Sequence, residues 1–153
     1  MSFFSAASET ALRLLTYVNA QTANPQKLSV QEIAVPTGTP VTYAAKILQI
    51  LARKGLLSST RGPHGGFYLD HRQMKQVTAY QVVVAMDGDS MFSTCLLGLK
   101  DCTSSRPCPM HDEFTLIRQR LTQALQQTSL AALAERYKSG QYFVSLDDIH
   151  LKK

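Results

Sequence analysis

The sequence predicts a mainly α-helical fold that carries one small β-hairpin. Apolar residues recur at the three- and four-residue spacing of a helix face in several segments of the 153-residue chain. Two short strand-like runs within residues 56–69 are joined by a turn rich in Gly and Pro. With 44% hydrophobic residues, the chain is long enough for one domain with an extension.

Charge is distributed unevenly along the chain, whose formal net charge is +5. Residues 1–75 contain eight Lys and Arg against three Asp and Glu, whereas residues 76–153 contain eight of each kind. A basic half joined to a neutral half is typical of a protein that binds a polyanion with one face, and nucleic acid is the commonest such partner. A basic surface without a partner is the alternative.

The first helix is expected at residues 5–20, closed by Asn24-Pro25. A short second helix begins at Ser29, because Ser29 and Glu32 have the spacing of a capping box, and it ends before Pro36. The apolar face of the first helix consists of Ala11, Leu14, Leu15 and Val18.

A third helix follows a turn at Gly38 and extends to about Lys54, with Thr39 as its N-cap and Pro40 at its first position. Two helices joined by a tight turn form a helix-turn-helix, whose second helix enters the major groove of DNA. The inward face is expected to hold Ala44, Leu48, Leu51 and Ala52. The opposite, polar stripe is Thr42, Lys46, Gln49 and Arg53, which is either a DNA-binding face or a solvated one; Thr42, Tyr43 and Gln49 would lie nearest the bases.

The hairpin at residues 56–69 is expected to be the wing of a winged helix-turn-helix. Its turn, Arg61-Gly62-Pro63-His64-Gly65, would lie over the phosphate backbone or in the minor groove, with Arg61 as the cation and His64 as a polar loop residue. The alternative is that Arg61 is a surface arginine that contacts no DNA. The predicted DNA-binding region therefore spans residues 1–75.

Residues 76–111 are expected to form a connecting helix, from Thr78 to about Met86, and a loop that holds all three cysteines. Residues 112–138 follow as helices, the second capped by Ser129, and residues 139–153 as a tail. The first of these helices has an apolar seam that suits packing against a partner helix or against its own domain: Phe114, Ile117, Leu121 and Ala124.

The cysteines are separated by six and five residues, and His111 follows the last by three. The N-terminus does not resemble a secretory signal, and no apolar run is long enough to span a bilayer, so we expect a cytoplasmic location. The cytoplasm is reducing, and there clustered cysteines favour metal binding over a disulfide. Zinc sites usually use closer pairs, whereas an iron–sulfur cluster suits longer gaps but needs a fourth ligand. The cysteine ligands would be Cys95, Cys102 and Cys108.

The run from Lys54 to Leu69, with its Arg-Gly-Pro-His-Gly-Gly wing, resembles the Rrf2 family of bacterial regulators, as do residues 5–13, residues 82–88 and the cysteine loop. The resemblance implies a long dimerisation helix and an iron–sulfur cluster, [4Fe–4S] or [2Fe–2S]. It also implies a fourth ligand: Glu9 from the partner subunit, as in NsrR-like relatives, which we place ahead of His111, as in some IscR-like ones. The six-residue gap before Cys102 is one longer than in many relatives.

The sequence thus predicts a homodimeric transcription factor that binds double-stranded operator DNA and senses nitric oxide, oxygen or iron through the cluster. A zinc-bound or cluster-free repressor is the alternative within the same class. A thiol redox enzyme is less favoured, because the chain has no Cys-x-x-Cys pair.

Overall fold

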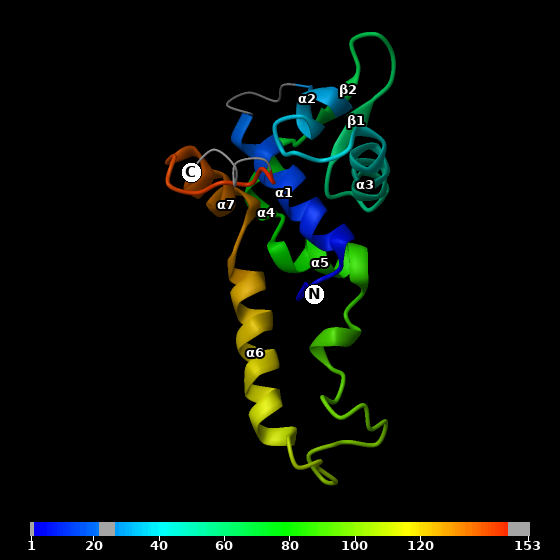
Figure 1. Ribbon diagram of the computed structural model, residues 1–153, viewed down its shortest axis with the longest axis vertical. Helices are drawn as coiled ribbons and strands as arrows, with labels where there is room; N and C mark the ends of the chain where they lie inside the picture. Colours follow the sequence, from blue (N-terminus) through cyan, green and yellow to red (C-terminus); the bar gives the residue numbers. More distant parts are fainter. Residues whose placement is uncertain (1, 22–26, 147–153) are drawn as a thin grey trace.

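The computed structural model describes residues 2–21 and 27–146 (Figure 1). The predicted end of the first helix at Asn24-Pro25 and the last seven residues of the tail lie outside this part. The mainly helical fold with a two-stranded antiparallel hairpin is confirmed. In chain order the elements are α1 (Ala6–Gln21), α2 (Val30–Ala34), α3 (Val41–Arg53), β1 (Ser58–Thr60), β2 (Gly66–Tyr68), α4 (His71–Gln76), α5 (Ala79–Asp87), the 3₁₀ helix η1 (Ser90–Phe92), α6 (His111–Gln127) and α7 (Leu130–Lys138).

Helix α1 is the centre of the fold, because it packs against α3, α5 and α7 (Figure 1). Helix α6 extends away from this body, beside the loop that follows η1. Leu130 of α7 joins the same core as the N-terminal helices, so the end of the chain folds back onto its beginning. The fully buried side chains of this core include Leu14, Leu15, Val18, Ile33, Leu48, Leu51, Leu69, Val82 and Leu130.

Side-chain caps set the starts of four helices. The capping box at α2 is confirmed: the Glu32 N–H donates to Ser29 Oγ and the Ser29 N–H donates to Glu32 Oε2. Thr78 begins α5 with a capping box to Gln81, and at the start of α7 the Ser129 side chain accepts a hydrogen bond from the Ala132 N–H. Helix α4 was not predicted, although Asp70 and Gln73 form a capping box with Asp-x-x-Gln spacing; the helix is only six residues long and too short to show a periodic pattern.

Two local expectations at α3 are wrong. Pro40, rather than Thr39, occupies the N-cap position, because the Thr39 hydroxyl pairs with the buried Thr37 hydroxyl at 3.0 Å instead of capping the helix. Ile47 completes the buried face, whereas Ala52 is half-buried and borders the wing.

No helix in residues 2–21 and 27–146 is long and apolar enough to cross a membrane. The C-terminal segment after α7 packs back onto the body, where the Leu146 N–H donates to the carbonyl of Thr37 at 3.4 Å. Ser145 is buried beside it. At least this part of the predicted tail is therefore built into the fold.

Candidate DNA-binding surface and metal-binding loop

Helix α3 presents its polar stripe to solvent. Ala44, Ile47, Leu48 and Leu51 are buried on one side, which holds the helix against α1 and α2. The predicted contact residues on the other side, Thr42, Lys46, Gln49 and Arg53, are all exposed. Tyr43 is half-buried and packs against the core, so its side chain is less accessible than theirs.

The wing depends on two adjacent glycines. A Cβ atom on Gly65 would lie 2.2 Å from the carbonyl oxygen of Thr60, and one on Gly66 would lie 2.6 Å from that of Leu28. Gly66 must come close because Phe67 exchanges two backbone hydrogen bonds with Leu28, at 2.8 and 2.9 Å, which attach the hairpin to the chain before α2. Close packing therefore requires glycine at both positions of the Gly-Gly pair in the wing motif.

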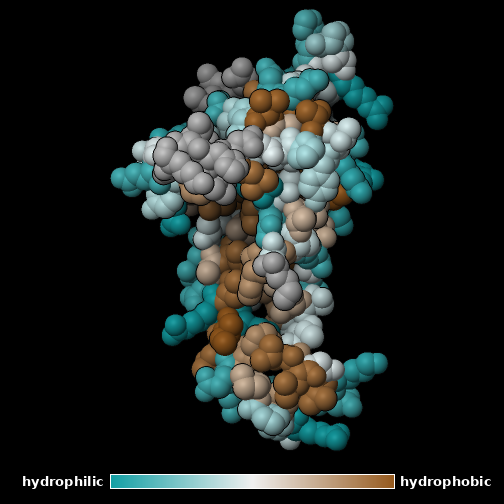
Figure 2. All heavy atoms as spheres, viewed as in Figure 1, coloured by the Kyte–Doolittle hydropathy of each residue, from teal (hydrophilic) through white to brown (hydrophobic). Residues whose placement is uncertain are grey.

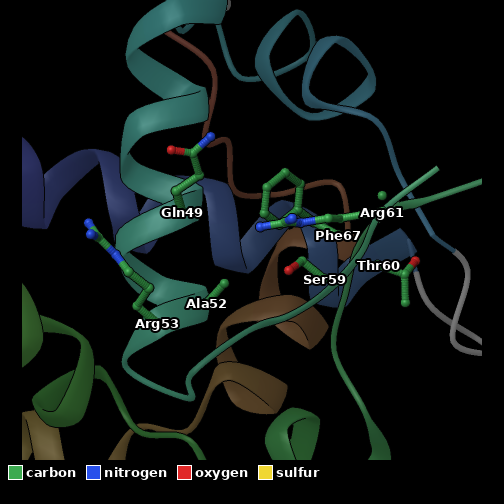
Figure 3. A pocket seen from close by; sticks show the side chains of 8 residues that line it. Gln49, Ala52, Arg53, Ser59, Thr60, Arg61 and Phe67 are labelled. Carbon is green, nitrogen blue, oxygen red and sulfur yellow. The ribbon is translucent and has the colours of Figure 1, made fainter.

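A groove of about 450 Å³ separates α3 from the wing (Figure 3). In this view Gln49 and Arg53 project from the helix, and Arg61 extends from the hairpin toward it, beside Phe67. His64 lies exposed in the turn between the strands and does not line the groove. The groove residues are Gln49, Ala52, Arg53, Ser59, Thr60, Arg61, Gly66 and Phe67.

The cations of this surface have no acidic partners within the described chain. Within the described residues, 2–21 and 27–146, the structure contains one ion pair, between Lys138 and Glu135 on α7. Lys46, Arg53 and Arg61 are exposed and make no ion pair among these residues. Their charge is free to attract phosphate groups, and guanidinium groups suit phosphate geometry.

The cysteine loop, residues 95–111, brings its three thiols together. The sulfur atoms of Cys95, Cys102 and Cys108 all lie within 4.8 Å of one another. Cys95 and Cys108 are 3.6 Å apart, and the Cys108 N–H donates to the Cys102 sulfur at 3.4 Å. The loop consists of turns and one isolated bridge, between Thr103 and Arg106.

Of the two candidate fourth ligands, His111 lies at this cluster of thiols. Its Nδ1 atom is 3.2 Å from the Cys102 sulfur, because His111 is the first residue of α6 and the loop folds back over that end of the helix. Glu9 lies half-buried in the first turns of α1 and is not among the metal-ligating side chains that converge here in the described part of one chain. The role proposed for Glu9 is as a ligand that one subunit contributes to the cluster of its partner.

The environment shifts the pKa values of Cys95 and Cys108 in opposite directions. A hydrogen bond from the Leu99 backbone, with a further one from Leu97, lowers the pKa of Cys95 to about 7. Burial raises the pKa of Cys108, whose side chain is only 9% exposed. Of these two thiols, Cys95 therefore provides a thiolate at neutral pH more readily, and thiolates are the form that binds metals.

Arg118 anchors the start of the loop, and sequence analysis did not identify it. Its guanidinium donates to the carbonyl oxygens of Ser93 and Thr94, just before Cys95, and lies 5.2 Å from the centre of the Phe114 ring. The spacing of Phe114 and Arg118 on one helix face was the available signal. This contact connects the loop to α6 at a second point, about two turns beyond His111.

Part of the surface around the thiols is apolar. Figure 2 shows hydrophobic side chains gathered at the end of the molecule where the cysteine loop and the start of α6 lie. Leu96, Leu97 and Leu99 of the loop are each about half exposed. Such a patch is unusual on the surface of an isolated chain and typical of an interaction site.

These features define a class of protein: a winged helix-turn-helix DNA-binding regulator with a cysteine-rich loop. Comparison with known proteins gives the family. The model of the Rrf2 family, described as an iron-dependent transcriptional regulator, matches residues 4–136, and the chain belongs to this family. Its relatives are transcriptional regulators that bind DNA and are not enzymes.

Among its relatives, an HTH-type transcriptional regulator of Aquifex aeolicus is 26% identical over 132 residues, which are 85% of this chain and 90% of that protein. The regulator IscR of Photorhabdus laumondii is 28% identical over 102 residues, 67% of this chain and 61% of that protein. The solved structure of CymR, the global cysteine regulator of B. subtilis, has a TM-score of 0.73 at 20% identity and covers 89% of this chain and 98% of its own. The last comparison supports the fold.

Proposed function

We propose that this regulator is a homodimer whose cysteine loop holds an iron–sulfur cluster that controls its affinity for operator DNA. The observation that carries the proposal is the convergence of three thiol sulfurs within 4.8 Å at the start of α6. Thiolates are the usual ligands of such clusters. When bound, the cluster supplies a centre that reacts with oxygen or nitric oxide and is lost when iron is scarce.

The donor set fits a cluster that lacks one cysteine ligand. Cys95 and Cys102 are half-exposed, Cys108 is buried, and the imidazole of His111 lies beside Cys102. A ligand other than thiolate is compatible with known clusters, in which histidine replaces cysteine at some irons. The turn-rich loop between the thiols allows them to adjust their spacing.

A single zinc ion is the second candidate, and one distance favours it. Zinc with Zn–S bonds of about 2.3 Å holds its tetrahedral ligands about 3.8 Å apart. The 3.6 Å between the sulfurs of Cys95 and Cys108 is close to this value. Three thiolates with His111 would complete a Cys₃His set of the kind found in structural zinc sites.

The surface of α6 supports a dimer. None of its 17 residues is buried in the single chain. Leu116 and Ile117 are 58% and 55% exposed, and Phe114 and Leu121 of the predicted seam are half-buried. A helix that exposes this apolar surface favours packing against a second helix of the same kind, and a two-fold dimer would present two wings to a pseudo-palindromic operator.

Contacts within the chain provide a route from the cysteine loop to the DNA-binding surface. Arg118 holds the start of the loop on α6, and η1 joins the loop to α5. Asp87, at the end of α5, accepts hydrogen bonds from Ser5, just before α1. Because α1 packs directly against α3, a shift at the loop has a short packed path to the DNA-binding helix.

Anaerobic purification tests the proposal. We expect brown protein containing iron and acid-labile sulfide, and a changed affinity for DNA fragments selected from a random-sequence pool once the iron is removed. Colourless protein with one zinc per chain would instead identify the second candidate. Equal DNA affinity with and without bound metal would contradict a sensory role for the loop, while leaving the DNA-binding function intact.

A further inference from the structure

The three thiols of the cysteine loop do not have the same neighbours. Cys95 and Cys108 are paired with each other, at 3.6 Å between their sulfur atoms. The Cys102 sulfur lies within 4.8 Å of both other sulfurs, but it also lies 3.2 Å from Nδ1 of His111 and accepts the Cys108 N–H at 3.4 Å. Cys95 and Cys108 therefore have only each other and Cys102 as sulfur neighbours, whereas Cys102 is also held by an imidazole and an amide.

We propose that Cys95 and Cys108 form a disulfide in the metal-free chain when it meets a low-molecular-weight disulfide, and that Cys102 stays reduced. A disulfide needs the two sulfurs at about 2.05 Å. The required approach is small, and the segment between the two cysteines consists of turns rather than helix or strand. The inference concerns the free thiols and does not depend on which metal the loop binds.

Exposure sets the order of the two steps. Cys95 is half-exposed, whereas Cys108 is 9% exposed, so of these two thiols the reagent meets Cys95 first. The Cys95 thiolate attacks one sulfur of the reagent, a mixed disulfide forms and one small thiolate leaves. The Cys108 thiolate then attacks the Cys95 sulfur and expels the second small thiolate. Two protein thiols are oxidised and one small disulfide is reduced to two thiols.

The product would remove two of the three thiolate ligands. The remaining pair, Cys102 and His111, is too small a set for a stable cluster or a closed zinc site. Oxidation of the empty loop would therefore block metal loading until a cellular reductant cleaves the bond. The reduced metal-free loop and the oxidised metal-free loop would then be two different states of the regulator.

Peptide mapping tests the pairing in the full-length chain. The protein is freed of metal with a chelator, treated with oxidised glutathione, quenched in acid, alkylated and digested with trypsin. Trypsin cleaves after Lys100 but not after Arg106, which Pro107 follows, so Cys95 lies in one peptide and Cys102 with Cys108 in the next. Fragment ions between Cys102 and Cys108 then show which of the two is cross-linked.

We expect one free thiol per chain after oxidation, at Cys102, and a cross-link from Cys95 to Cys108. Cys102→Ser should form the same cross-link at an unchanged rate and retain no free thiol. Cys108→Ser should accumulate the glutathione adduct at Cys95 and form an intrachain cross-link more slowly, by on the order of tenfold. A main cross-link that includes Cys102, or adducts without any intrachain disulfide in the unmodified chain, would overturn the assignment.

Discussion

The Cys102 sulfur lies 3.2 Å from Nδ1 of His111, the residue at which α6 begins. This distance brings an imidazole to the thiol cluster within one chain, whereas Glu9 is not among the side chains that converge there and is proposed as a ligand from a partner subunit. A metal ligand on the first turn of α6 would connect the metal directly to the helix that we propose forms the dimer.

His111→Ala should therefore weaken metal retention by about tenfold or more, because a ligand is lost. The sequence resemblance placed Glu9 ahead of His111, but His111 is the one at the thiols within one chain, so we expect Glu9→Ala to have a smaller effect on retention and on the visible spectrum. The measurement is the rate of iron or zinc transfer to a chelator after anaerobic reconstitution. His64→Ala, which removes an exposed histidine from the wing, is the matched control. Faster metal loss from Glu9→Ala than from His111→Ala would assign the fourth ligand to the partner's carboxylate.

Arg61 should contribute a phosphate contact from the wing. Arg61→Ala is expected to weaken DNA binding by about 1–2 kcal/mol and to reduce the slope of log affinity against log salt by about 0.9. Titrations at several salt concentrations measure both quantities. Arg136→Ala removes the same charge from an exposed site on α7 and should change neither. An unchanged salt slope in Arg61→Ala would contradict the contact.

The close packing at Gly65 makes a prediction about the shape of the wing. In Gly65→Ala the new Cβ would meet the Thr60 backbone, which cannot move without opening the hairpin. We expect a loss of about 2–3 kcal/mol in unfolding free energy, measured with urea, together with weaker DNA binding. Gly62→Ala is the control, since its Cβ would meet nothing within 4 Å and only its φ of +101° is unfavourable, at about 1 kcal/mol. Equal losses in the two variants would show that the hairpin tolerates the clash.

Asp87 should make stability depend on pH in the acid range. Burial raises the pKa of Asp87, but the hydrogen bonds from the Ser5 hydroxyl and N–H outweigh it, so the pKa lies below its ordinary value. A lowered pKa in the folded state means that the carboxylate stabilises the fold above the unfolded-state pKa, near 3.9, and that this contribution is lost as the pH falls through the lower folded value.

Asp87→Asn should accordingly lower stability by about 1 kcal/mol at pH 7 and have less effect at pH 3. Urea unfolding at the two pH values measures the difference. Asp89→Asn, at an exposed position two residues further on, serves as the control. A loss in Asp87→Asn that is the same at both pH values would show that the charge of the carboxylate is not what joins α5 to α1.

The exposed side of α6 should hold the dimer together. Ile117→Glu places a charge on the apolar seam, and we expect it to convert the dimer into a monomer in sedimentation experiments. Gln119→Glu introduces the same charge on another side of the helix and should leave the dimer intact. A dimer that persists in Ile117→Glu would place the interface elsewhere.

Local signals in the sequence were sufficient for most of the helices. The Ser29–Glu32 capping box and Ser129 lie where expected, because a cap is formed by residues three positions apart and needs no distant partner. Helix α4 was missed and the N-cap of α3 was misplaced by one residue. In the second case Thr37, buried by the folded body, takes the Thr39 hydroxyl as its partner.

By itself, the sequence determined the winged helix-turn-helix, the polar stripe of α3, the Gly-Gly wing and the identity of the three cysteines, since each depends on residue type and short spacing. Only the tertiary structure decided which side chains lie next to each thiol, with Cys95 beside Cys108 and Cys102 beside His111. It also revealed Arg118 as the anchor of the loop and the contact between Asp87 and Ser5. These relationships join residues from different elements, and sequence spacing contains no information about distances that packing creates.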